Sequence, residues 1–83
     1  MQALNAQPRV LQVWEEVIGV LLQVYAQDEG EVIVNISGRI YVLKNFPEKL
    51  LENLKAHVQN LVGILRTEDG YAMRVISRTK YWG

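Results

Sequence analysis

Apolar and polar residues alternate along the middle of this chain, between residues 31 and 43. A period of two is typical of half-buried strands, and Ser37 and Gly38, which separate two alternating runs, form a two-residue turn signal. We therefore predict a β-hairpin in this region. The residues expected on its core face are Val32, Val34, Ile36, Ile40 and Val42.

A helical pattern follows the hairpin. From about residue 46 to residue 59, apolar side chains recur every three or four positions, which is the spacing of one face of an amphipathic helix. Asn45 is the expected N-cap, because Pro47 stands in the first turn and Glu48 follows the cap by three residues. Asn60 is the expected left-handed residue that ends the helix.

A second hairpin is predicted at the end of the chain, with strands over residues 61–66 and 71–78. The intervening turn contains Gly70, which can adopt a positive φ without steric cost. Apolar residues of the helix and of both hairpins should meet in one core. Its predicted centre is Leu50, Leu54, Val34, Ile64 and Val75.

Residues 9–27 fit two structures. Polar residues recur every three or four positions, which favours a helix, whereas the many β-branched residues and an interior glycine favour a strand. We prefer a strand from about residue 16 to residue 26, bent at Gly19. Its expected core face is Ile18, Val20, Leu22 and Val24.

The preferred fold class is mainly β with one helix (α+β), in a single domain over residues 1–83. It is a small, five-stranded, partly open barrel with the OB-like order β-β-β-α-β-β. The alternative order is α-β-β-α-β-β, in which an N-terminal helix over residues 9–27 packs on a four-stranded antiparallel sheet.

The composition argues against most kinds of catalysis. The chain has no cysteine, so it has no disulfide, thiolate metal site or cysteine nucleophile, and this fits a reducing compartment. The single histidine, His57, lies at the edge of the apolar helical stripe, while the adjacent Glu15 and Glu16 should point apart. We expect no enzymatic activity, no metal or other cofactor and no small-molecule substrate.

The apolar runs are short. The longest, residues 17–22, falls far below the roughly 20 residues that cross a bilayer, and the first residues do not resemble a secretory signal. We expect a cytoplasmic protein with no membrane partner.

Positive charge is concentrated in the later part of the chain. Residues 1–31 hold five acidic residues and one basic residue, whereas residues 32–83 hold eight basic and four acidic residues. If Tyr71 and Met73 face the core, Arg74 and the cations that follow it should share the opposite face. Cations beside aromatic rings can bind the phosphates and stack the bases of a single strand. The predicted nucleic-acid-binding residues are Arg39, Tyr41, Arg74, Arg78, Lys80 and Trp82.

The sequence thus predicts a small binding domain, with weak binding of single-stranded nucleic acid as its leading function. Zero net charge counts against tight nucleic-acid binding, and cations also protect edge strands from aggregation. The alternative is therefore a homo-oligomeric protein-interaction or assembly module without a nucleic-acid ligand. We expect a homodimer, because so short a chain buries a limited core. Its candidate interface residues are Val13, Val17, Leu21 and Tyr25.

Overall fold

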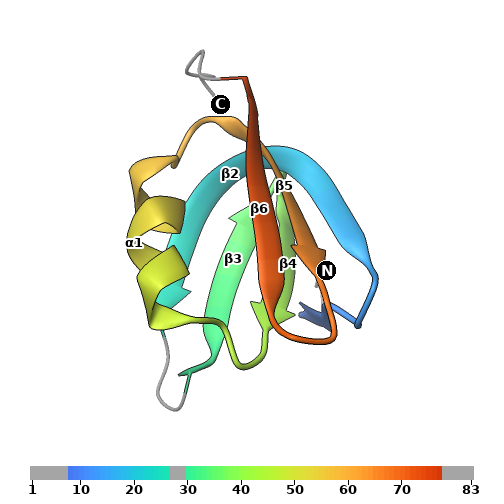
Figure 1. Cartoon of the computed structure of the whole chain (residues 1–83). Helices are drawn as coiled ribbons and strands as arrows, with labels where there is room; N and C mark the ends of the chain where they lie inside the picture. Colours follow the sequence, from blue (N-terminus) through green and yellow to red (C-terminus); the bar gives the residue numbers. More distant parts are fainter. Residues whose placement is uncertain (1–7, 27–29, 78–83) are drawn as a thin grey trace.

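The structure is a computed structural model and describes residues 8–26 and 30–77. In this part of the chain it contains six strands and one helix, so the protein is mainly β with one helix, as predicted (Figure 1). The elements are β1 (Arg9–Val10), β2 (Glu16–Ala26), β3 (Val32–Ile36), β4 (Arg39–Leu43), α1 (Glu48–Ala56), β5 (Leu61–Arg66) and β6 (Tyr71–Ser77).

The six described strands form one mixed sheet in the order β1-β4-β3-β2-β5-β6. β1 runs parallel to β4, and all other neighbours are antiparallel. β1 and β6 are the two edges, so the sheet is not closed, and it has one strand more than the predicted five. The extra strand is the two-residue β1. From β2 onward the element order is the predicted one, and the alternative helix over residues 9–27 is wrong.

β2 is the central strand and belongs to both halves of the sheet. Its first half pairs with β5, from Glu16 opposite Leu65 to Val20 opposite Leu61. Its second half pairs with β3, beginning at Leu21. Figure 1 shows β2 arching from one half to the other. The sheet therefore folds over at β2, and its two halves enclose the core.

Gly19 allows the change of partner within β2. A Cβ at this position would lie 2.5 Å from Ser37 Oγ and 2.7 Å from Ile36 Cγ2. The Val20 amide donates a hydrogen bond to Ser37 Oγ at 2.9 Å, and the Ser37 amide donates to the Val20 carbonyl at 2.8 Å. The predicted bend residue is thus the place where β2 passes closest to the turn between β3 and β4.

The predicted core face of β2 is wrong over its first half. Val17 and Leu21 are buried, whereas Ile18 is 52% exposed. A register shift between Leu21 and Gln23 then changes the alternation, so that Val24 lies opposite the buried Val34 and packs against the core, as predicted. The reason for the mismatch is this bulge, because an extra residue in one strand moves the following side chains to the other face.

The predicted core face of β4 is also wrong. Tyr41 lies opposite the buried Val34, and Leu43 lies opposite the buried Val32, so Ile40 and Val42 occupy the other face. A two-residue turn pairs the residue before it with the residue three positions later, which reverses the phase of the alternation.

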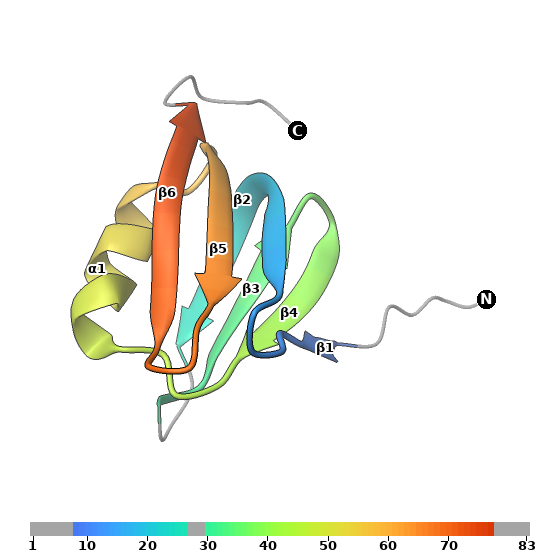
Figure 2. The same ribbon diagram turned by 45° about the vertical axis from the view of Figure 1, so that its right-hand side comes forward.

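The second hairpin has the predicted orientation. Tyr71 and Met73 pack against the core, and Val75 lies opposite the buried Val62. Arg74 lies opposite Gly63 on the other face and is exposed. We call this the outer face of the β2–β5–β6 half of the sheet. Figure 2 shows β6, β5 and β2 side by side from another angle.

The core agrees largely with the prediction. Leu54, Val34 and Ile64 are fully buried, Leu50 packs against the buried cluster, and Val75 is half-buried. The full set of buried hydrophobic residues is Leu11, Val17, Leu21, Val32, Val34, Ile36, Leu43, Phe46, Leu54, Val62 and Ile64.

α1 is shorter than predicted and has different ends. Its N-cap is Pro47 without a side-chain hydrogen bond, whereas the expected cap, Asn45, lies in the preceding turn with a φ of 57°. At the other end Gln59, rather than Asn60, takes the left-handed conformation, with a φ of 77°. Leu54 is the buried residue of α1. Within residues 8–26 and 30–77, no helix has the length and apolar character needed to cross a membrane.

Candidate interaction surface

Of the six predicted nucleic-acid-binding residues, the three that the structure describes do not share one face. Arg39 and Tyr41 share a face, but it is the core face, and Tyr41 is half-buried against the core. Arg74 is exposed on the outer face of the other half of the sheet. The expected surface of Arg39, Tyr41 and Arg74 is therefore wrong as a single platform. The remaining three residues, Arg78, Lys80 and Trp82, lie outside the described residues.

Arg74 is paired with an acid. Its Nη2 atom lies 3.5 Å from Glu16 Oε2, and both side chains are partly exposed. A pair of this kind contributes about 0–1 kcal/mol to stability, and the neighbouring carboxylate lowers the positive potential that Arg74 would offer to a phosphate. Ion pairs of the described part of the chain are Arg9–Glu15, Lys44–Glu31 and Arg74–Glu16.

Apolar side chains surround the Glu16–Arg74 pair on the outer face. Ile18 is 52% exposed, Ile76 is 43% exposed, and Ala72 is exposed beside them in the alternation of β6. Because β6 ends the strand order of the described sheet, this apolar surface reaches a strand edge. The outer face of a small protein is usually polar, so exposed isoleucines on two strands of one face make it the candidate contact surface of the described residues.

The outer face is hollowed at Gly63, which has no side chain. A Cβ at Gly63 would lie 3.1 Å from Glu16 Oε2 and 3.3 Å from Arg74 Nε, so the two charged side chains extend over the bare backbone of β5. A hollow of about 180 Å³ lies here. Its lining residues are Glu16, Gly63, Leu65, Ala72, Met73 and Arg74.

A turn over residues 12–15 lies beside this face, at the end of the β2–β5 ladder. The Glu15 amide donates to the Gln12 carbonyl at 3.0 Å, and the two central residues are Val13 and Trp14. Trp14 has a φ of 67° and is 62% exposed, and Val13 is 44% exposed. A positive φ at the third residue of such a turn matches type II, which favours glycine or asparagine there.

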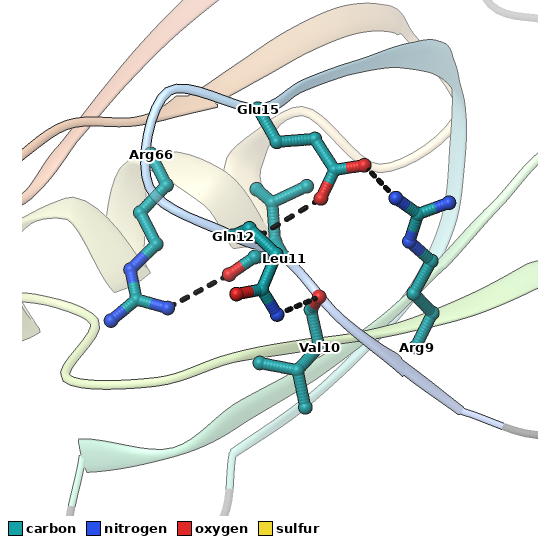
Figure 3. A network of polar contacts seen from close by, with 6 residues as sticks. All are labelled: Arg9, Val10, Leu11, Gln12, Glu15 and Arg66. Carbon is teal, nitrogen blue, oxygen red and sulfur yellow. Dashed lines mark hydrogen bonds and ion pairs between the residues drawn. The ribbon is translucent and has the colours of Figure 1, made fainter.

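Polar contacts hold this turn against β1 and β5, and Figure 3 shows those made by side chains. Arg66 Nη1 donates to the Leu11 carbonyl at 2.8 Å, and the Trp14 amide donates to the Arg66 carbonyl at 2.6 Å. The Glu15 carboxylate accepts from the Gln12 amide at 3.0 Å and pairs with Arg9. The backbone of the turn is thus fixed from both sides, although its central side chains face solvent.

A second hollow, of about 140 Å³, lies where the turn after β5 meets the loop after β4. Beside it the Tyr71 hydroxyl donates to the Lys44 carbonyl at 2.6 Å, and its ring lies 4.9 Å from that of Phe46. Burial raises the pKa of Tyr71 above its ordinary value of 10.0, and the nearby charge of Arg66 partly opposes this. We interpret these contacts as a structural link between β4 and β6.

The adjacent carboxylates Glu15 and Glu16 do not converge. Glu15 pairs with Arg9, whereas Glu16 pairs with Arg74. His57 Nδ1 lies 2.8 Å from the Asn53 carbonyl, a contact within the helical segment. No group of three or more histidine, aspartate and glutamate side chains in the described ranges is arranged to hold a metal ion.

The sequence prediction missed two of the surface residues, Ile18 and Trp14. Ile18 was expected in the core, and only the bulge after Leu21 explains why the opposite phase is correct. Residues 12–15 contain no glycine, proline, asparagine or aspartate, so no turn signal marks Trp14. Of the predicted dimer residues, Val13 and Tyr25 are exposed, but Val17 and Leu21 belong to the core and are not available to a partner.

No family model, curated protein or solved structure matches the chain.

Proposed function

We propose that this protein is a homo-oligomeric assembly module whose interface is the outer face of β2, β5 and β6. The observation that supports this proposal best is the exposed apolar surface around the Glu16–Arg74 pair, where Ile18 and Ile76 are 52% and 43% exposed. A small chain with a limited core gains stability by covering such a surface.

The charges of this face favour a second copy as the partner. Each copy presents one acid and one cation side by side, and the whole chain has a formal net charge of zero. Across a two-fold axis every contact occurs twice: if residue i of one copy touches residue j of the other, residue j of the first also touches residue i of the second. Such an axis can therefore place Glu16 of each copy against Arg74 of the other, without repulsion and with the isoleucines buried around them.

Binding of single-stranded nucleic acid is the second candidate function. The observation in its favour is the element order from β2 onward, with a long β2 shared between two hairpins and a helix between them. This is the order of the OB-like barrel that the sequence predicts, and such barrels commonly bind single strands. We rank it second because Arg74 is paired and Tyr41 packs against the core.

Sedimentation and light scattering over the micromolar range test the assembly proposal. Ile18→Glu should make the protein monomeric, because it places an unpaired charge within the apolar face. Tyr25→Glu is the matched control, since Tyr25 is similarly exposed, at 44%, on the β3-paired half of the same strand. A wild-type protein that stays monomeric at high concentration would refute the proposal, as would equal effects of the two variants.

Salt dependence separates the two candidate functions. Association through an apolar face should hold or strengthen as salt rises, whereas binding of a labelled single strand should weaken by counterion release. Neutralising three phosphates gives a log–log slope of about −2. Absence of binding to any single strand at about 50 mM salt would eliminate the nucleic-acid function. A cytoplasmic location and the lack of enzymatic activity remain predictions from the composition.

A further inference from the structure

We infer that Trp14 is the anchor of the interface, and that the indole of one copy occupies the hollow over Gly63 in a second copy. This inference rests on the proposed self-association and specifies which residues make it selective.

The backbone of Trp14 is the first observation behind this inference. Its φ of 67° is a conformation that bulky side chains rarely adopt and that glycine adopts freely. The fold does not require an indole here, since Trp14 is 62% exposed and contributes nothing to the buried core. A residue that is unfavourable for the turn and unused by the core is best explained by a contact with another molecule.

The backbone of the turn that carries the indole is also held in place before any partner binds. The Trp14 amide donates a hydrogen bond to the Arg66 carbonyl, and Arg66 Nη1 donates to the Leu11 carbonyl, a contact drawn in Figure 3. Both bonds hold the backbone of the turn on β5. Tryptophan is enriched among the residues that dominate binding energy at interfaces, and a rigid loop loses little entropy when it binds.

The hollow over Gly63 has the chemistry of an indole site. Its volume is about 180 Å³, Leu65 and Ala72 line it, and the Glu16 and Arg74 side chains extend over the backbone of Gly63 at its floor. The Arg74 guanidinium lies at the same hollow and can contact the face of an aromatic ring through a cation–π interaction. Glu16 also lines the hollow, so the site suits an indole, which combines an apolar ring with an N–H donor.

The turn that carries Trp14 adjoins strand residues that line the hollow, so one two-fold axis could bring the anchor of each copy to the hollow of the other. Trp14 precedes Glu16 by two residues, and Glu16 lines the hollow. The 12–15 turn ends the β2–β5 ladder next to Leu65, which also lines the hollow. A second copy can thus offer its hollow to the anchor of the first while its own anchor fills the hollow of the first. The occupant that fits best is therefore another copy of the same chain.

Trp14→Gly is the most informative variant. It removes the indole but suits the positive φ, so the thermal midpoint should stay close to that of the wild type when both proteins are measured at concentrations where they are monomeric. The dissociation constant of the dimer should increase by about 30-fold or more, as for the loss of an interface hot spot. If Trp14→Gly formed a dimer as tight as that of the wild type, the inference would be overturned. If Ile18→Glu abolished association in the same assay, the proposed interface would still stand without Trp14 as its anchor.

Ala72→Leu tests the hollow from its rim. If the outer face were only a general apolar patch, the added side chain would tighten association. If the hollow receives an indole, the larger side chain should obstruct it and weaken association, and a tighter dimer would overturn the inference. This variant should fold, because Ala72 is exposed.

Fluorescence gives an independent measure that a purely structural role of Trp14 would not change. Trp14 and Trp82 are the two tryptophans of the chain, so Trp82→Phe leaves one reporter. Its emission should shift to shorter wavelength as the dimer forms, since the indole leaves water. An unchanged spectrum over a concentration range in which sedimentation shows dimerisation would overturn the inference. A monomer at every concentration would instead refute the proposed function, and this inference with it.

Discussion

Gly19→Ala is the sharpest test of the fold, because the close approach at this residue allows β2 to serve both halves of the sheet. The added Cβ would lie 2.5 Å from Ser37 Oγ and 2.7 Å from Ile36 Cγ2, and Ile36 is only 2% exposed and held in the core. Ile36 therefore has little room to move. The Ser37 side chain must shift, and its hydrogen bond from the Val20 amide is then lost.

The expected cost follows from three effects. Overpacking of a tight site costs about 1–3 kcal/mol. Loss of one hydrogen bond adds about 0.5–1.5 kcal/mol. Alanine has a lower backbone entropy than glycine in the unfolded chain, which offsets about 0.5–1 kcal/mol of this loss of stability. The net loss is about 2 kcal/mol, which is a large part of the stability of a domain of this size.

Gly63→Ala is the matched control, because Gly63 also lies within a central strand. The nearest neighbours of its Cβ would be Glu16 Oε2 at 3.1 Å and Arg74 Nε at 3.3 Å, and these partly exposed side chains, unlike the buried Ile36, can move aside. We expect unchanged stability or a gain of up to about 1 kcal/mol. Urea unfolding followed by circular dichroism, at concentrations where the protein is monomeric, measures both variants.

The double variant Gly19→Ala/Ser37→Gly locates the clash. Removing the Ser37 side chain relieves one of the two close contacts, and glycine suits the φ of 53° at this position. We therefore expect part of the lost stability to return, with a favourable coupling energy between the two sites. If Gly19→Ala were as stable as Gly63→Ala, β2 would not pass as close to Ser37 as described.

Two further predictions concern the core and its link to β6. Leu54→Ala should cost about 2–5 kcal/mol in the same unfolding assay, because Leu54 is fully buried, and a loss below about 1 kcal/mol would show that α1 is not packed as described. The raised pKa of Tyr71 means that the folded state favours the protonated hydroxyl. The contribution of this hydroxyl to the free energy of unfolding is therefore complete below its ordinary pKa of 10.0 and is lost as pH rises through the folded-state pKa. Unfolding free energy should therefore fall more steeply above about pH 10 in the wild type than in Tyr71→Phe, and equal slopes would count against the burial of this hydroxyl.

The existence and type of the main elements could be predicted, because alternation and helical spacing are local properties of the sequence. Which face of each strand is buried was harder to predict. On β4 the answer was available, since the two-residue turn requires Tyr41, not Ile40, to lie opposite Val34. On β2 it was not, because the bulge after Leu21 depends on pairing with two different strands.

The candidate site was less accessible from sequence than the core. Arg74 could be placed on a solvent face from alternation, but its partner Glu16 lies far away in sequence and joins it only through the pairing of β2, β5 and β6. Trp14 lies in a turn that is fixed by contacts with Arg66 rather than by turn residues. A surface assembled from three strands cannot be derived from the local pattern of any one of them.

The sharing of β2 also has a consequence for the order of folding. Each hairpin, β3–β4 or β5–β6, pairs residues that are close in sequence and can form early, whereas pairing of Glu16 with Leu65 must close a loop over most of the chain. The contact from Arg66 to Leu11, which spans 55 residues, depends on the same closure. Docking of β2 should therefore be the slow step of folding. The Val13 and Trp14 turn takes its native place only when that step is complete, so the proposed assembly surface would be absent from chains that are still partly folded.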